Sequence, residues 1–145
     1  RMEFAGYWSV YWYNGVLVGS EGTRGLDIFE LVPSGFISQN EIDAAKSVHL
    51  DYLNVQGQPK FVWPPSFALA RAYVDQLERS KGLEAGRISS VRKELASAEK
   101  ASGEARKSAL THLEGELEAY SAGAADPAKV RTLADAVKEL STATN

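Results

Sequence analysis

Two histidines are the side chains of this chain that suit acid–base chemistry or metal binding best, because the sequence contains no cysteine. His49 is followed by Asp51 and preceded by Asp43, an imidazole and two carboxylates that would suit a divalent cation if they met. No second histidine lies nearby, however, and the spacing matches no common metal motif. We interpret His49 as an ordinary residue of a connecting segment and keep a part in a metal-dependent enzyme only as the weakest alternative.

Acidic residues surround the second histidine, His112, which is followed by Glu114, Glu116 and Glu118. Glycoside hydrolysis needs two carboxyl groups that face each other across a cleft, whereas a run of glutamates on one helix faces solvent. The sequence also contains neither a phosphate-binding glycine loop nor a nucleophile elbow. We therefore interpret this region as a solvated helix face, and predict no catalytic residue, no metal, no cofactor and no enzyme activity.

Aromatic side chains are the other group with a chemical use, and most of them lie in residues 7–13. Aromatic rings can form a platform for a carbohydrate or a protein partner. They also pack sheets, and packing is the interpretation that we favour. The candidate contact residues are Trp8, Tyr11, Trp12, Tyr13 and Trp63.

The aromatic segment is predicted to be the first strand of a three-stranded antiparallel meander. Asn14 and Gly15 lie between two β-rich runs, which is the strongest short hairpin signal because both turn residues need a positive φ. Residues 21–25 then predict a second turn and residues 26–31 a third strand. Strict alternation would place Trp8, Val10 and Trp12 on one face and Tyr7, Tyr11 and Tyr13 on the other. Three short strands cannot cover two such faces by themselves.

Helices are predicted for most of the remaining chain. Residues 38–41 have the spacing of a capping box and begin a short helix, which a connector with Gly57 and Pro59 follows. Further on, apolar side chains recur at intervals of about three and four residues, as in helices that form a bundle. Pro65 is expected in the first turn of the first of these helices and Gly82 just beyond its end. The predicted helices span residues 39–48, 65–81, 84–102, 104–122 and 127–141.

One alternative remains open in the helical region. Gly103 costs only about 1 kcal/mol in a helix interior, so residues 84–120 could form one helix instead of two. The sequence thus predicts an α+β fold with three parts. These are a β meander over residues 1–35, a short helix with a packed connector over residues 36–64, and a bundle of three to four helices over residues 65–145.

Composition excludes several classes of partner. The net charge is −3, which gives no basic face for nucleic acid or an anionic membrane. No stretch approaches the roughly 20 apolar residues that span a bilayer, although association with a membrane complex remains compatible with the sequence. The chain begins at Arg1, and nothing near it has the order of a signal peptide. We therefore expect a fragment whose upstream part would carry any export signal.

Three segments of the β-rich region carry a resemblance to a known family. They are residues 6–15, Gly19-Ser20-Glu21 and residues 24–31. With residues 39–42, the Trp63-Pro64 junction and the helical tail, they resemble the closing blade and C-terminal extension of bacterial LVIVD-repeat proteins. The resemblance implies a β-propeller of four-stranded blades, of which residues 1–35 would be the end. It also implies a periplasmic or extracellular, surface-associated location, and it supplies no catalytic residues.

These observations favour a non-catalytic structural or interaction module. The chain would be the C-terminal fragment of an exported, propeller-type protein, and an accessory subunit of a larger assembly is one form that it could take. Its partner would be another protein or the remainder of the same precursor. Carbohydrate binding through the exposed aromatic residues is the first alternative. The identity of the partner, the oligomeric state and the physiological process stay open.

Overall fold

The computed structural model describes residues 6–143, and the chain divides into two compact units between Pro64 and Pro65. The first unit contains three strands and one α-helix, and the second contains four α-helices. The predicted α+β fold is confirmed. The described residues hold five α-helices, the short α1 and the four helices of the second unit. This number is slightly above the predicted three to four.

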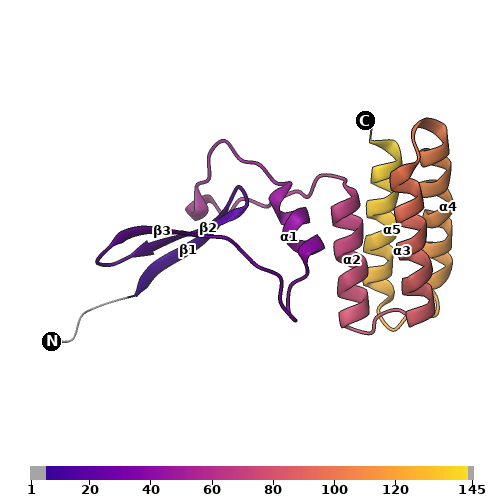
Figure 1. Cartoon of the computed structure of the whole chain (residues 1–145), viewed down its shortest axis with the longest axis horizontal. Helices are drawn as coiled ribbons and strands as arrows, with labels where there is room; N and C mark the ends of the chain where they lie inside the picture. The colour runs from indigo at the N-terminus through magenta and orange to yellow at the C-terminus, as the bar shows by residue number, and fades with distance from the viewer. Residues whose placement is uncertain (1–5, 144–145) are drawn as a thin grey trace. The chain divides into compact units, whose positions relative to one another are not determined.

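The sheet is the predicted antiparallel meander, with the strand order β1-β2-β3. Its strands are β1 (Tyr7–Tyr13), β2 (Val16–Glu21) and β3 (Gly25–Phe29) (Figure 1). Asn14 and Gly15 join β1 to β2 with φ values of 45° and 91°. Positive φ at both positions is the backbone twist that a two-residue hairpin requires, so the predicted Asn-Gly turn is confirmed.

The predicted faces of β1 need one correction, because a β-bulge interrupts the strand between Tyr7 and Ser9. An extra residue in a strand shifts the alternation of its side chains by one. Tyr7 therefore lies opposite Glu21 and shares a face with Val10 and Trp12, instead of facing the other way with Tyr11. The Tyr7 ring meets the Phe29 ring edge to face, with centroids 5.7 Å apart.

Polar contacts fix the short helix α1 (Gln39–Lys46) and the connector after it. The capping box is confirmed: the Ser38 hydroxyl accepts a hydrogen bond from Glu41 N at 3.2 Å, and the Glu41 carboxylate accepts one from Ser38 N at 2.7 Å. The connector contains a single 3₁₀ turn, η1 (Val55–Gly57). The Asn14 side chain bonds both backbone groups of Leu50, at 2.8 and 2.9 Å, which holds the hairpin turn against the connector.

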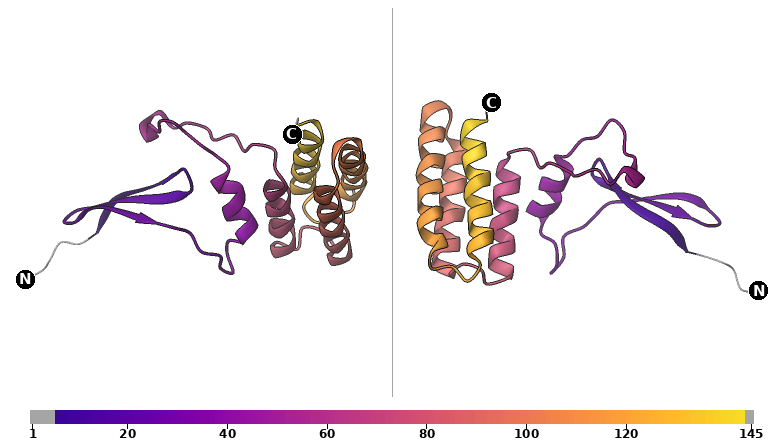
Figure 2. Two further views of the ribbon diagram at one scale, coloured as in Figure 1. Left: turned by 45° about the horizontal axis from the view of Figure 1, so that its top comes forward. Right: turned by 180° about the vertical axis from the view of Figure 1, so that it is seen from behind.

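The second unit is an up-and-down bundle of four helices (Figures 1 and 2). They are α2 (Phe67–Arg79), α3 (Ala85–Lys100), α4 (Gly103–Ser121) and α5 (Pro127–Thr142). The helices pack mainly in the pairs α2–α3, α3–α4, α4–α5 and α2–α5. The predicted apolar positions form the core. Its fully enclosed side chains include Val74, Leu77, Ile88, Val91, Leu95, Leu110, Leu113, Leu117, Val130, Leu133 and Val137.

Two predicted details of α2 differ in the structure. Pro65 lies before the helix, because Ser66 is the N-cap and its hydroxyl accepts a hydrogen bond from Leu69 N at 3.1 Å. At the other end the left-handed residue is Lys81, with a φ of 55°. Gly82 follows it and donates to Leu77 O at 2.8 Å, which is the Schellman arrangement. Gly82 is needed for space, since an added Cβ would lie 2.9 Å from Leu77.

Residues 84–120 form two helices and not one long helix. Ala101 and Ser102 are extended, so that α3 and α4 form a sharp corner. The Arg106 guanidinium bonds Ala101 O at 2.9 Å and Glu99 O at 3.3 Å, and thereby satisfies carbonyls at the end of α3. Gly103 begins α4 with a φ of 54°, a conformation that a residue with a Cβ adopts only at a cost.

The corner predicts that replacing glycine by alanine changes the free energy of unfolding in opposite directions at positions 103 and 115 of α4. Gly103→Ala should lower the free energy of unfolding by about 1 kcal/mol, because the left-handed conformation is unfavourable for alanine. Gly115→Ala, in the exposed interior of the same helix with nothing near the added methyl group, should raise it by about 0.5–1 kcal/mol. Urea denaturation followed by circular dichroism measures both. Stabilisation by Gly103→Ala would contradict the corner and favour a continuous helix.

Candidate functional site

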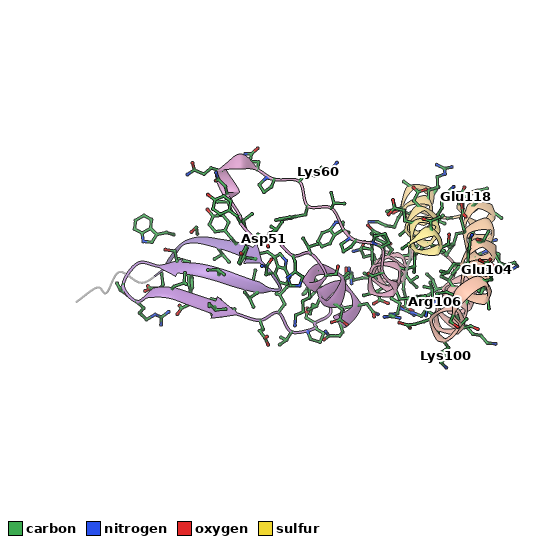
Figure 3. The ribbon with its side chains drawn as sticks, turned by 90° about the horizontal axis from the view of Figure 1, so that it is seen from above. Asp51, Lys60, Lys100, Glu104, Arg106 and Glu118 are labelled. Carbon is green, nitrogen blue, oxygen red and sulfur yellow. The ribbon has the colours of Figure 1, made fainter. Side chains whose placement is uncertain are left out.

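Exposed apolar side chains distinguish the first unit from the second. Every large apolar side chain that is exposed in residues 6–143 lies between positions 7 and 63. In the described part of the bundle, by contrast, large aliphatic side chains are buried. Side chains of the sheet stand out on both sides of its ribbon (Figure 3). The sheet is therefore the part of the described chain whose surface most resembles an uncovered interior.

One face of the sheet is apolar, and we call it the apolar face. The register pairs Tyr11 with Val18 and Val18 with Ile28, and the next row contains Leu26. Cross-strand partners lie on the same face. Leu26 and Ile28 are 63% and 64% exposed. Within the three paired strands this face carries only apolar, tyrosine and serine side chains, so covering it would bury no charged group.

The opposite face carries a polar cluster beside its apolar residues. The Tyr7 hydroxyl donates to the Asp27 carboxylate at 2.6 Å, and Arg24 donates to the same oxygen at 2.9 Å. The hydrogen bond to Asp27 raises the pKa of Tyr7. This face is therefore mixed in character, and its charges already have partners within the sheet.

A buried carboxylate fixes the turn between β2 and β3. Glu21 is 5% exposed, and its oxygens accept hydrogen bonds from Gly6 N at 3.1 Å, Thr23 N at 2.8 Å and the Thr23 hydroxyl at 2.9 Å, and also from Arg24 N. Backbone donors from Thr23, Arg24 and Gly6 lower the pKa of Glu21 from 4.5 to about 2. Three of these four donors belong to Thr23 and Arg24 of the turn itself, so we assign Glu21 to holding the turn.

The five predicted contact residues do not form one platform. Trp8 lies at the bulge and is 85% exposed, whereas Tyr13 lies at the other end of β1 and donates to Asp51 O at 3.4 Å. Trp63, 39% exposed, belongs to the connector. Tyr11 and Trp12 do share a feature: with connector residues they line a hollow of about 260 Å³. The other residues that line it are Leu53, Val55, Gln58, Pro59 and Phe61.

The residues considered for a metal site at His49 do not form a three-ligand group in the described part of the chain. Within residues 6–143, His49 belongs to no group of three or more ligand atoms close enough to share an ion. Asp43 instead accepts a hydrogen bond from Gln39 at 2.7 Å, and Asp51 lies on the connector, as does Lys60 (Figure 3). His49 lines a second hollow, of about 470 Å³, between the end of α1 and the connector.

The interpretation of His112 as part of a plain solvated helix face needs correction. His112 and Glu116 of α4 meet Glu94 of α3, and one potential ligand atom of each lies within 4.8 Å of the other two. We call these residues the His–Glu cluster. His112 Nδ1 lies 3.7 Å from Glu94 Oε2 and 3.6 Å from Glu116 Oε2. Burial, and then the neighbouring Glu116 carboxylate, raise the pKa of Glu94.

Sequence reasoning missed Glu94 for a definite reason. The spacing of His112 and Glu116 places both on one side of a helix turn, and this pair was visible in the sequence. Glu94 joins them only because the chain turns back at Ala101 and Ser102, and the sequence left that turn open. Glu114, which lies between His112 and Glu116 in the sequence, pairs instead with Lys138 of α5 at 3.1 Å.

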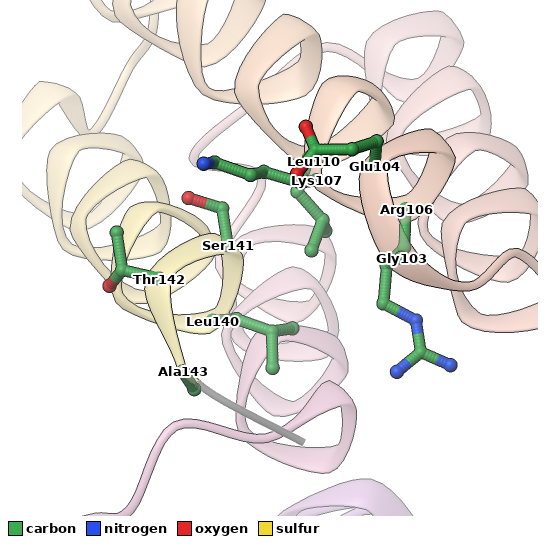
Figure 4. Close-up of a pocket in the computed structure, with 9 residues that line it drawn as sticks. All are labelled: Gly103, Glu104, Arg106, Lys107, Leu110, Leu140, Ser141, Thr142 and Ala143. Carbon is green, nitrogen blue, oxygen red and sulfur yellow. The ribbon is translucent and has the colours of Figure 1, made fainter.

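A further hollow, of about 400 Å³, lies between the start of α4 and the end of α5 (Figure 4). Glu104, Arg106 and Lys107 line it together with Leu110 and Leu140. The Arg106 guanidinium is already bonded to carbonyls of α3. Arg106 therefore serves the corner between α3 and α4, and we assign no ligand to the hollow.

Comparisons of the chain with protein families, curated proteins and solved structures give no match. The resemblance to LVIVD-repeat proteins stays a prediction. No helix within residues 6–143 combines the length and the apolar character that crossing a bilayer requires.

Glu21 gives the turn a defined dependence on pH. Because the folded pKa is lowered, the stabilisation is complete above pH 4.5 and is lost as the pH falls toward about 2. We expect the Glu21 carboxyl group to titrate in NMR spectra with a midpoint near 2, and the amide signals of Thr23 and Arg24 to move with it. In Glu21→Gln this transition should be absent. A midpoint above 4 would contradict the assignment of the carboxylate to the turn.

Proposed function

We propose that this chain is a non-catalytic structural or interaction module that docks β-structure of a protein partner, or of the remainder of its precursor, on the sheet. The observation that carries the proposal is the contrast between the two units. The bundle encloses its large aliphatic side chains, whereas the sheet leaves Ile28 and Leu26 more than half exposed. Contiguous apolar surface of this kind marks an interaction site in a protein that can otherwise bury its core.

The chemistry of the sheet favours β-structure as the occupant. The three strands leave the outer edges of β1 and β3 unpaired within the sheet, and unpaired edges present backbone donors and acceptors to a further strand. The apolar face next to them has the side chains of a sheet interior. A propeller blade has four strands and packs face to face on its neighbours. Both features are what the propeller-type protein implied by the resemblance would require. The exported or surface-associated location rests on that resemblance alone.

Carbohydrate binding is a second candidate, favoured by the hollow beside Tyr11 and Trp12. Its volume of about 260 Å³ falls just below the range of roughly 300 Å³ and more for small-molecule sites. An aromatic wall suits the apolar side of a sugar ring. Gln58, the Tyr11 hydroxyl and the Trp12 indole N–H are the polar side-chain groups in the lining, which is a small set for a ligand rich in hydroxyl groups.

Site-specific photocrosslinking tests the docking proposal in cells that make the native protein. A photoreactive amino acid at Ile28 should give a defined protein adduct, and mass spectrometry should map the attachment to a β-strand of the partner or precursor. The same amino acid at Ala119, an exposed position of α4, is the control and should give far fewer adducts.

A variant separates docking from folding. A photoreactive amino acid in place of Trp8 should form the same adduct as the one at Ile28. Leu26→Ser with Ile28→Ser should abolish this adduct, because the double substitution places hydroxyl groups on the apolar face. Unfolding of the bundle should be unchanged, since neither side chain belongs to its core. Equal adducts from α4 and the sheet, or adducts that survive the double substitution, would contradict the proposal.

Glycan binding provides the test of the second candidate. Trp12→Ala should abolish binding to an immobilised glycan panel if the hollow is a sugar site, whereas Trp8→Ala, outside the hollow, should leave it intact. We expect no binding by the unaltered chain, which is the outcome that favours the docking proposal.

A further inference from the structure

We propose that Glu94, His112 and Glu116 bind a divalent transition-metal ion of the Zn²⁺ type, which joins α3 to α4. The donors would be His112 Nδ1 and the Oε2 atoms of the two glutamates, which are the atoms that face one another in the cluster. This inference concerns the bundle and does not depend on the function proposed for the sheet.

The distances in the cluster fit a shared ion better than direct hydrogen bonds. His112 Nδ1 lies 3.7 Å from Glu94 Oε2 and 3.6 Å from Glu116 Oε2. Hydrogen bonds between nitrogen and oxygen measure about 2.7–3.2 Å, so neither carboxylate bonds the imidazole directly. Tetrahedral zinc with bonds of about 2.0–2.2 Å separates its ligand atoms by roughly 3.3–3.6 Å. The two separations lie at or just above the upper end of this range.

An unsatisfied carboxylate oxygen points to the same place. Glu116 Oε2 is buried and finds no hydrogen-bond partner within residues 6–143. A buried acceptor without a partner is unfavourable, and such atoms are few in folded proteins. Because this oxygen is one of the three converging atoms, a cation between them would satisfy it and would also offset the repulsion between the two carboxylates.

The outer oxygens of both glutamates have neighbours that set their orientation. Glu94 Oε1 accepts from the Ser90 hydroxyl at 3.4 Å, and Glu116 Oε1 accepts from the Tyr120 hydroxyl at 3.5 Å. Both contacts are long, but each leaves the Oε2 atom free to face the cluster. Ligating carboxylates in metal sites are commonly held in this way by a second layer of hydrogen bonds.

The set of donors indicates the class of ion. One imidazole with two carboxylates suits zinc and its neighbours in the first transition series, whereas magnesium and calcium prefer oxygen donors throughout. Three protein ligands leave a position for water, and the His112 side chain is 71% exposed, so that water can reach the cluster. The spacing of His112 and Glu116 lets one helix supply two ligands.

Isothermal titration of the full chain with zinc chloride at pH 7.5 tests the proposal. We expect one site per chain, and at least a tenfold loss of affinity in His112→Ala and in Glu116→Gln. Glu118→Gln is the matched control on the same helix, outside the cluster, and should keep the affinity of the unaltered chain. Magnesium chloride should give no saturable binding at concentrations that saturate with zinc.

Two further measurements separate metal binding from a structural role of the same side chains. Zinc should shift the imidazole signals of His112 in NMR spectra, and it should raise the melting temperature of the unaltered chain but not that of Glu116→Gln. Circular dichroism without metal establishes that each variant is folded. Absence of saturable zinc binding, or equal affinity in Glu116→Gln and Glu118→Gln, would overturn the proposal.

Discussion

A single sheet has two faces, and three short strands supply no second layer to cover either of them. This constraint governs the first unit of the chain. The strands here are rich in aromatic and β-branched residues, which form a sheet readily but require burial. Because the described residues leave Leu26 and Ile28 largely exposed, the sheet has the composition of an interior and the exposure of a surface. The docking proposal follows from that mismatch.

The four helices of the bundle bury their apolar side chains against one another. Each helix presents a narrow apolar stripe, and four stripes close around one another, so that side chains such as Leu95 and Leu117 are completely enclosed. Closure depends on the corner at Ala101 and Ser102, which sends α4 back along α3. The corner also brings Glu94 opposite His112. The candidate metal site is thus a consequence of the turn, and not of any motif within one helix.

The sequence predicted the features that depend on local chemistry. The Asn14-Gly15 turn, the capping box at Ser38 and Glu41, and the apolar stripes of the bundle follow from backbone preference and periodicity, and all are present. Features that depend on distant neighbours were missed. The bulge after Tyr7 moved that ring to the other face, and the third member of the His–Glu cluster came from a different helix. No pattern within residues 7–13 or 112–116 contains that information, because it arises from how the segments pair and fold back.

Polar contacts hold the sheet in shape at its two turns, and the Tyr7–Asp27–Arg24 cluster lies on the face opposite the apolar face. Glu21 gathers the backbone donors of the second turn, and Asn14 bonds both backbone groups of Leu50 beside the first. Neither anchor uses the apolar face around Tyr11 and Ile28. A surface that is ordered before it binds loses less conformational entropy on binding, so more of the apolar contact energy remains as affinity. The placement of these polar groups therefore supports docking of a partner on a preformed sheet over folding of the sheet upon the partner.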